Sequence, residues 1–266
     1  MRPRTGRQLM DGQERYHHWQ EGLVSIIVPV LELKRKRRLR YPLAPRRNIS
    51  DLLEDLVKTE GVETEVIVVC NSREDDLVGL IAADSRVDKY CLNSVNAGVA
   101  RSWNMGAMMA EGEFLCFLND DVAIKHDSIA ILRDALTARD DIGQVGPEGA
   151  LWTDLEPGRY VGQEDMEEAD AISGYAFMVK RPVFDQAGGF DVTYTPAGVE
   201  EIDFSFSVRE AGYKCLVVPR SGITHHGTSG VSSMDTTIDY FNSSIGTFEL
   251  SKRNRAIFRK KWSGND

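Results

Sequence analysis

A short apolar run that ends in three polar residues limits the fold of this chain more than any other feature. Residues 114–118 are apolar throughout, as in a strand buried on both faces of a sheet. Asn119, Asp120 and Asp121 follow directly. Open α/β sheets bind ligands at the carboxyl ends of their strands, and two adjacent carboxylates there repel each other unless a cation lies between them. The stretch indicates either a site for Mg²⁺ or Mn²⁺, ions often carried by nucleotide phosphates, or an acidic turn that caps the next helix.

Strand-like and helix-like segments alternate on both sides of this run. Asn48 and Asn96 precede two of the helices and are predicted to be their N-caps. Pro29 cannot donate to a ladder, so we expect it at the end of the first strand. The alternation predicts an α/β fold with a mostly parallel central sheet that helices cover on both faces. Strands are predicted over 23–31, 65–70, 87–92 and 142–146, and helices over 49–57, 75–83, 97–110 and 126–138.

The second half of the chain has a weaker pattern. Residues 150–170 are acidic and loop-like, and 171–179 are strand-like. A short helix opens at Arg181-Pro182 and closes at Gly188-Gly189. In 200–211 the apolar residues alternate with period two, which favours a strand, whereas the glycine that follows favours a helix with a glycine C-cap. We choose the helix because a strand over 214–218 follows directly; beyond it, 222–230 is predicted to be a loop and 235–262 partly helical.

Charge is unevenly distributed. The net charge is −9, which argues against general nucleic-acid binding, yet residues 31–47 hold eight basic side chains and one acidic one. We expect a loop there. One interpretation is a solvated insertion. Another is that residues 34–40 contact an anionic acceptor or a membrane surface. A nonspecific nucleic-acid contact agrees least with the acidic remainder of the chain.

Cysteine usage and hydropathy indicate the compartment. The four cysteines show no CxxC spacing, and three lie in apolar strand-like runs, where reduced buried thiols are expected. No run approaches the roughly 18 apolar residues of a membrane span, and the amino terminus has no signal-peptide core. We expect one large domain or two small ones, in the cytoplasm or peripheral at the inner membrane face.

Four ordered motifs resemble those of the family 2 glycosyltransferases of the GT-A fold. The most specific is NAGVAR at 96–101, followed by NMG at 104–106 and by GEFLCFLNDD at 112–121. GGFD at 188–191 comes next, then EEID with REAGY within 200–213. The closing Lys261-Trp262, after Phe258, is similar to the ends of bacterial rhamnosyl- and related transferases. The resemblance covers about residues 23–230.

The resemblance implies a GT-A, Rossmann-like fold with a smaller acceptor-binding half. It divides the chain into an extension (1–22), a nucleotide-sugar-binding half (23–147), an acceptor-binding and catalytic half (148–233) and a helical end (234–266). It also implies metal-dependent transfer of a sugar, with inversion, from a nucleotide-diphospho-sugar to the hydroxyl of a saccharide or lipid-linked acceptor. The cofactor would be Mn²⁺ or Mg²⁺.

Site residues follow from the same motifs. The metal is assigned to Asp121, with Asp120 assisting. The resemblance adds His225, with His226 as second choice, and a solvated loop is the alternative for the histidines. Glu201 matches the catalytic base, with Asp203 and Glu200 as alternatives, although three acids can also simply favour a helix start. Donor contacts are assigned to six residues: Pro29, Val30, Asn71, Arg101, Asn119 and Asp120. For Arg101 the alternative is a charge on the helix surface.

Two departures from the family pattern leave other functions open. Cys70 stands where the family has an acid that contacts the nucleotide, and Asn119 replaces the first aspartate of the DxD motif. A neutral first ligand should weaken metal affinity. A degenerate, non-catalytic nucleotide-sugar-binding protein is therefore the main alternative. A nucleotidyltransferase ranks lower, because residues 31–47 are basic but lack the glycines of a phosphate-binding loop.

Overall fold

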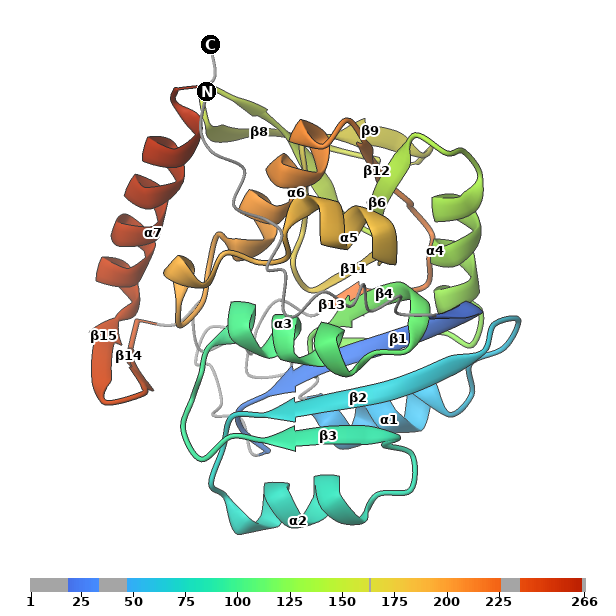
Figure 1. Cartoon of the computed structure of the whole chain (residues 1–266), viewed down its shortest axis with the longest axis vertical. Coiled ribbons are helices and arrows are strands. Elements are labelled where there is room, and N and C mark those ends of the chain that lie inside the picture. Colours follow the sequence, from blue (N-terminus) through green and yellow to red (C-terminus); the bar gives the residue numbers. More distant parts are fainter. Residues whose placement is uncertain (1–18, 34–46, 163, 226–234, 265–266) are drawn as a thin grey trace, which may run out of the picture.

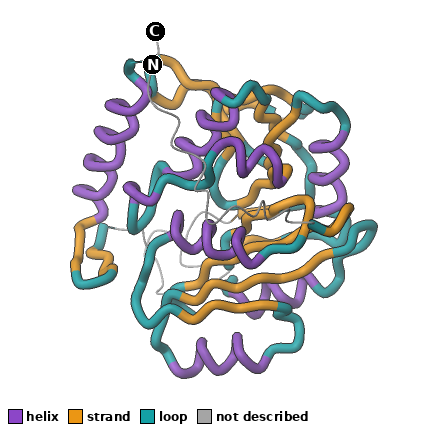
Figure 2. The backbone as a smooth tube through the Cα atoms, in the orientation of Figure 1, coloured by secondary structure: helices purple, strands orange, loops and turns teal. Residues whose placement is uncertain are grey.

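The computed structural model describes residues 19–33, 47–162, 164–225 and 235–264. In this part of the chain an eight-stranded sheet has the order β3-β2-β1-β4-β11-β6-β12-β9 (Figures 1 and 2). Only β11 and β9 run against the others, so the predicted mostly parallel α/β sheet is confirmed. The strands are β1 (Gln20–Val30), β2 (Thr64–Cys70), β3 (Lys89–Leu92), β4 (Gly112–Leu118), β6 (Ile142–Gly146), β9 (Glu167–Ala169), β11 (Ala176–Lys180) and β12 (Lys214–Val217).

Helices cover both faces of the sheet, as predicted. Successive residues of β1 point to opposite faces, so Ile26 packs in one core and Ile27 in the other. The first core also holds Leu52 and Leu132, and the second holds Trp103. One face carries α1 (Ile49–Leu56), α2 (Asp75–Ala83) and α4 (Ser128–Thr137), and the other carries α3 (Val99–Met109), α5 (Arg181–Ala187) and α6 (Glu200–Glu210).

One of the two predicted helix caps is confirmed and the other is wrong. Asn48 caps α1 in a capping box, accepting from the backbone of Ser50 at 2.8 Å. Helix α3 has Gly98 as its N-cap instead of Asn96. Gly98 has φ +85°, and a Cβ there would lie 2.8 Å from the carbonyl oxygen of Pro196, so the tight approach of two backbones selects glycine.

The stretch 150–170, predicted as a loop, contains three strands. Strands β7 (Gly149–Thr153) and β8 (Glu156–Val161) form a hairpin that β10 (Ala171–Ile172) extends to three strands, and β9 joins the edge of the main sheet. Most of β8 is exposed, so it lacks the apolar pattern that would have predicted it. The predicted strand 171–179 is in fact two strands, β10 and β11, which belong to different sheets.

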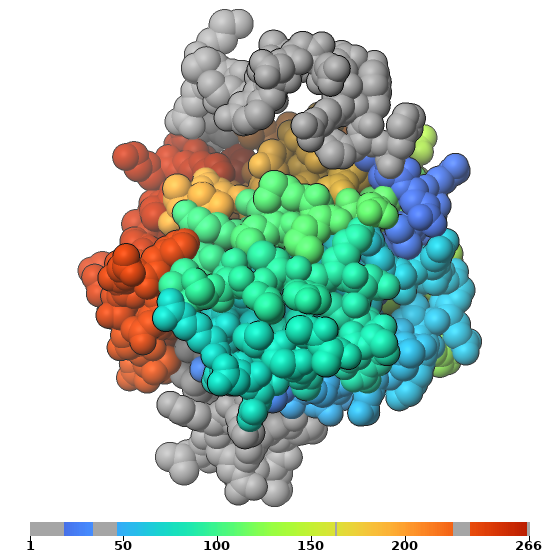
Figure 3. Space-filling view, turned by 60° about the horizontal axis from the view of Figure 1, so that its bottom comes forward, coloured from blue at the N-terminus to red at the C-terminus, as the bar shows by residue number. Residues whose placement is uncertain are grey.

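The carboxyl-terminal segment is partly helical, as predicted. A hairpin of β14 (Thr237–Tyr240) and β15 (Ser243–Gly246) leads into α7 (Thr247–Trp262), which lies along one side of the molecule (Figure 1). The hairpin sits beside the start of α3, where the backbone of Phe241 donates to the carbonyl of Asn96 at 3.1 Å (Figure 3). Short pieces complete the chain: β5 (Val122–Ala123), β13 (Thr224–His225) and the 3-10 helix η1 (Val192–Tyr194).

Some predictions fall on residues outside the described ranges: most of the amino-terminal extension, the basic residues 34–40 and His226. Within those ranges no helix combines the length and the apolar character needed to cross a membrane. All four cysteines are free thiols, in agreement with the prediction from their spacing.

Candidate active site

Two buried acidic residues follow β4 at its carboxyl end, next to the short β5–β13 ladder. We call the place where Asp120, Asp121 and His225 lie the corner. Asp120 and Asp121 are each 5% exposed. The following strand, β5, pairs antiparallel with β13, which sets His225 opposite Val122. Nε2 of His225 consequently lies 3.3 Å from Oδ1 of Asp121. The structure thus brings together the two residues that the sequence nominated as metal ligands.

An aromatic ring fixes the imidazole. Tyr175 stacks on His225 with 4.8 Å between ring centroids and 13° between ring planes, and its carbonyl accepts from the backbone of Asn119 at 2.8 Å. Burial and the nearby carboxylate of Glu148 raise the pKa of Tyr175, so its phenol stays protonated at neutral pH. Sequence reasoning missed Tyr175, because it lies in a stretch predicted as continuous strand.

The chemistry of this corner fits a divalent cation. Carboxylate oxygen suits Mg²⁺ and Mn²⁺, and imidazole nitrogen is a common ligand of transition metals. Among the described residues, no group of three or more His, Cys, Asp or Glu side chains is placed to hold a metal ion. The carboxylate of Asp121 and the imidazole of His225 are donors of the kinds that divalent cations bind.

Asn71 ties together the carboxyl ends of β1 and β2. Its backbone donates to the carbonyl of Val30 at 2.7 Å, and Nδ2 donates to Oγ of Ser102 at 2.7 Å. Oδ1 accepts from Nδ2 of Asn93 at 3.0 Å and from the backbone of Ala97 at 3.2 Å. The side chain of Asn71 thereby fixes the loop before α3.

Other nominated donor residues differ in their surroundings. Pro29 pairs with Val69 in the β1–β2 ladder, one residue before β1 ends, as expected. Cys70 is fully buried, and burial raises the pKa of its thiol, so a neutral group stands at the family's acidic position. The guanidinium of Arg101 donates to the carbonyl of Val192 at 3.3 Å and lies 5.2 Å from the centroid of the Phe241 ring, which connects α3 to η1 and the β14–β15 hairpin.

Three acids begin α6, directly after Val199, which has φ +82°. Glu200 is 3% exposed, and its Oε2 has no hydrogen-bond partner among the residues that the structure describes. Burial and the neighbouring carboxyl of Glu201 raise the pKa of Glu200 well above its ordinary value, and burial raises the pKa of Glu201 as well. Both groups are therefore easier to protonate than an exposed glutamate.

Glu201 lies over a glycine and faces a cavity. A Cβ added to Gly174 would lie 2.8 Å from Cγ of Glu201 and 3.0 Å from its Cδ, so the carboxyl group occupies the space beside this glycine. Gly174 directly precedes Tyr175, which stacks on His225. Glu201 also lines a cavity of about 320 Å³. The turn at 173–175 thus connects the start of α6 with the corner that holds Asp121.

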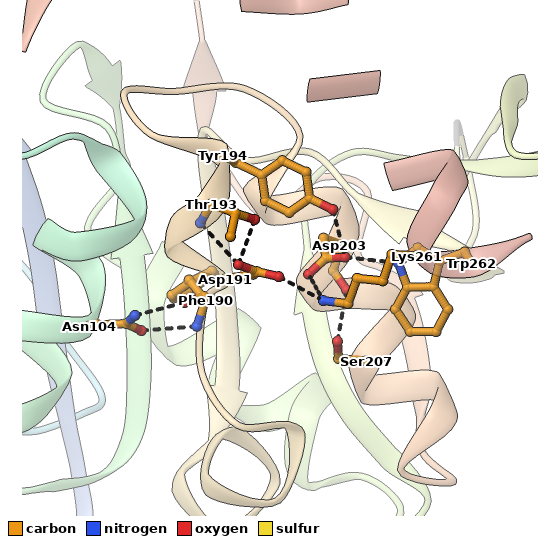
Figure 4. Close-up of polar contacts among 9 residues, drawn as sticks. All are labelled: Asn104, Phe190, Asp191, Thr193, Tyr194, Asp203, Ser207, Lys261 and Trp262. Carbon is orange, nitrogen blue, oxygen red and sulfur yellow. Dashed lines mark hydrogen bonds and ion pairs between the residues drawn. The ribbon is translucent and has the colours of Figure 1, made fainter. Parts of the chain in front are cut away.

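The carboxylate of Asp203 is surrounded by hydrogen-bond donors (Figure 4). Its Oδ1 accepts from the hydroxyl of Tyr194 at 3.0 Å and from Nε1 of Trp262 at 2.8 Å, while Oδ2 accepts from Nζ of Lys261 at 2.7 Å. Lys261 also donates to Asp191 at 3.2 Å. The motif residues Lys261 and Trp262 thus join the end of α7 to α6.

A second set of contacts joins α7 to the loop before α6. Asn254 is fully buried, and its Nδ2 lies 2.8 Å from the carbonyl oxygens of Tyr194 and Gly198 and 2.9 Å from that of Ala197. Sequence reasoning missed Asn254. The only signal was its place on the buried side of a helix, four residues before Phe258.

A family model describes a large part of this chain. The model of glycosyl transferase family 2 matches residues 46–185, just over half of the 266 residues. The chain belongs to this family. The matched range includes Asp121 and Gly174 and ends before α6.

Two curated relatives are similar over most of the chain or over half of it. The uncharacterized protein y4gI of Sinorhizobium fredii is 26% identical over 241 residues, which is 80% of this chain and 25% of that protein. The glucosyl-dolichyl phosphate glucuronosyltransferase of Haloferax volcanii is 24% identical over 168 residues, which is 57% of this chain and 53% of that enzyme. The chain therefore spans between a quarter and about half of the length of these relatives.

Solved structures share the GT-A fold of this family member. GalNAc-T7, solved with UDP, GalNAc and Mn²⁺, matches with TM-score 0.64 and 15% identity over 91% of this chain and 48% of its own. A TarS fragment from S. aureus in complex with UDP-GlcNAc matches with TM-score 0.57 and 18% identity over 80% of this chain and 62% of its own. The mannosyltransferase PcManGT of Pyrobaculum calidifontis, solved with GDP-Man and Mn²⁺, matches with TM-score 0.53 and 17% identity over 74% of this chain and 55% of its own.

Proposed function

We propose that this chain transfers a sugar from a nucleotide-diphospho-sugar to an acceptor hydroxyl, with inversion and with a divalent cation. One observation carries the proposal: the turn at 173–175 contacts both the start of α6 and the His225–Asp121 corner. Gly174 lies against Glu201, and the ring of Tyr175 stacks on His225. Such a transfer requires a carboxyl that accepts the proton of the acceptor hydroxyl and a site for a cation. Glu201 would supply the first, and the corner with Asp121 and His225 would supply the second.

Asp121 and His225 would hold the cation. Mn²⁺ suits this pair better than Mg²⁺, because one of the two donors is an imidazole nitrogen and Mg²⁺ prefers oxygen. Relatives of the same fold were solved with Mn²⁺ together with GDP-Man or with UDP. The cation, when bound, would neutralise the charge that develops on the departing diphosphate.

Glu201 would be the catalytic base. In a single displacement the acceptor oxygen bonds to the anomeric carbon, the bond from that carbon to the diphosphate oxygen breaks, and the hydroxyl proton passes to the Glu201 carboxylate. A raised pKa suits this role, because a stronger base accepts the proton more readily. Asp203 is less suited, since three donors from Tyr194, Lys261 and Trp262 occupy its oxygens.

The donor nucleotide would bind at the carboxyl ends of β1 and β2, beside Pro29 and Val30. We assign Asn71 and Arg101 to positioning this edge, because their polar groups are engaged within the protein. Asp120 and Asn119 would lie near the diphosphate. Recognition of the base would then depend less on an acidic side chain than is usual, since Cys70 replaces it.

The first experiment measures donor binding and donor hydrolysis. Calorimetric titration with UDP, GDP and dTDP, with and without Mn²⁺, identifies the nucleotide. Asp121→Ala and His225→Ala should weaken Mn²⁺-dependent nucleotide binding and abolish hydrolysis of the matching nucleotide-sugar. Asp140→Ala and His126→Ala are matched controls, because both wild-type side chains are exposed and lie outside the corner.

The outcomes separate the proposal from its alternative. If Asp121→Ala hydrolysed the donor as fast as the wild-type chain, the assignment of Asp121 as a metal ligand would be wrong. Tight nucleotide binding by the wild-type chain, without hydrolysis or transfer for any donor, would instead favour the non-catalytic binding protein that Cys70 and Asn119 left open.

A further inference from the structure

The cavity that Glu201 lines also has aromatic and basic side chains in its walls. Its walls come from the β7–β8 hairpin, the turn at 173–174, the start of α6 and one side of α7. The lining residues that matter here are Trp152, Tyr160, Glu201, Arg255, Phe258 and Arg259. None of the proposed donor or metal residues is among those that line it.

Three aromatic residues, Trp152, Tyr160 and Phe258, line this cavity. Trp152 packs against Phe258 with ring centroids 5.6 Å apart and against Phe206 at 6.0 Å, so its ring is held in place. Tyr160 is 56% exposed although it is a large aromatic residue. Aromatic rings that line a cavity together with charged side chains suit a ligand with both apolar faces and hydroxyl groups, and a pyranose ring has this character.

Two arginines of α7 also line this cavity. Helix α7 carries six basic residues and one acidic residue, a net charge of +5, in a chain whose total charge is −9. Arg255 and Arg259, one turn apart, both contact the single carboxylate of Glu156, with 3.8 Å from Nη1 of Arg255 to Oε2. Two guanidinium groups thus share one carboxylate. Both remain more than half exposed, with 57% and 54% of their side-chain surface accessible.

We propose that this cavity binds the acceptor, and that the acceptor is a saccharide with a phosphate or carboxylate group on the reacting sugar or its neighbour. The proposal rests on the proposed function, because Glu201 is the base that the acceptor hydroxyl must reach. A planar guanidinium donates two parallel hydrogen bonds to a carboxylate or phosphate, so Arg255 and Arg259 would bind the anion. The aromatic residues would hold the sugar ring with its hydroxyl toward Glu201.

The test uses matched pairs of small sugars and the full chain. Methyl glycosides of glucose, galactose and N-acetylglucosamine are compared with their 6-phosphates, and the first two also with their uronates. Dissociation constants are measured by ligand-observed NMR, and transfer is measured with the donor identified above. Anionic members should bind at least about tenfold more tightly than neutral ones, as expected for one charge-assisted contact, and added salt should reduce the difference. The 6-phosphates and uronates show which anion is preferred.

A pair of double variants locates the effect. Arg255→Gln with Arg259→Gln should abolish the preference for anionic sugars. Lys252→Gln with Lys260→Gln removes the same charge from exposed positions of α7 that do not line the cavity, and should keep the preference. Tyr160→Ala should weaken the binding of neutral and anionic sugars by the same factor. Circular dichroism reports whether each variant is folded.

Several results would overturn the inference: no binding of any anionic member, equal binding of neutral and anionic members, or equal loss of preference in both double variants. Because wild-type binding is measured directly, an unfolded variant does not remove the test. Donor hydrolysis without acceptor is measured separately, so failure of the proposed function is distinguished from failure of this inference.

Discussion

Two carboxyl groups at the start of α6 lie only two residues apart and have opposite surroundings. Asp203 is 1% exposed and accepts hydrogen bonds from Tyr194, Lys261 and Trp262. Glu201 lies against a glycine, lines a cavity and has a pKa that burial raises. Sequence alone offered both as candidates for the base.

The difference shows how neighbours decide the role of an acid. A buried carboxylate next to an ammonium and two other donors has its charge compensated and its position fixed, so it suits an anchor. A carboxyl that burial makes more basic, beside open space, suits proton transfer. We therefore interpret Asp203 as the point that holds α7 in place and Glu201 as the reactive group.

The largest effect should come from Glu201→Gln. The amide keeps the size of the side chain but cannot accept a proton, so kcat for transfer should fall by about 10² to 10⁴, the usual contribution of a general base. The thermal midpoint should change little. Transfer assays and thermal denaturation of the same samples check this.

Glu54→Gln, at an exposed position of α1, is the matched control and should keep wild-type activity. An active Glu201→Gln enzyme would contradict the assignment and transfer the role of base to Glu200 or Asp203.

The reverse result is expected for Asp203→Asn. Lys261 would lose one of its two anionic partners, and the free energy of unfolding should fall by on the order of 3 kcal/mol, the low end for breaking a buried ion pair. Urea denaturation measures it. Asp141→Asn is the control: its carboxyl makes solvent-screened surface ion pairs with Arg139 and Lys214, so its loss should lower the free energy of unfolding far less than Asp203→Asn does.

Activity resolves the comparison further. If Asp203 anchors α7, folded Asp203→Asn protein at low temperature should transfer sugar far better than Glu201→Gln. Equal loss of kcat in both variants would show that the two carboxyls share the chemistry.

Sequence predicted the fold well because its signals are local there. Apolar runs, the cap at Asn48 and the run ending in Asp121 specify strands, a helix and a polar edge without knowledge of tertiary contacts. The second half of the chain was predicted poorly for a physical reason: β8 is exposed and polar, and residues such as Tyr175 and Asn254 act through partners distant in sequence. The pairing of His225 with Asp121 was expected only through the resemblance, since their separation of 104 residues carries no periodic signal.

A smaller effect should come from Gly174→Ala. The new methyl group would lie 2.8 Å from Cγ of Glu201 and would displace the carboxyl, while the flexible side chain can rotate away at little cost in stability. We expect kcat to fall about tenfold, less than the hundredfold loss that a 1 Å misplacement can cause.

Gly79→Ala is the control, because a Cβ at this exposed helical position meets no atom within 4 Å. It should leave kcat unchanged and stabilise the protein by about 0.5–1 kcal/mol through helix propensity. Unchanged kcat in Gly174→Ala would mean that the observed position of Glu201 is not the reactive one.

The smallest effect concerns Glu200. Its pKa lies above the ordinary 4.5, because burial and the Glu201 charge disfavour its ionised form. The native state therefore binds more protons than the unfolded state above pH 4.5, and the free energy of unfolding should fall as pH rises from there through the native pKa. Glu200→Gln should flatten this decline, because an amide does not ionise.

The pH dependence of the rate separates the two glutamates. Because burial raises the pKa of Glu201 above the ordinary 4.5, the acid limb of kcat/KM should lie above that pH. Glutamine resembles protonated glutamate, so Glu200→Gln should keep this limb in place. A limb that disappears in Glu200→Gln would identify Glu200 as the base, and Glu201 would then be the residue that only modifies its neighbour.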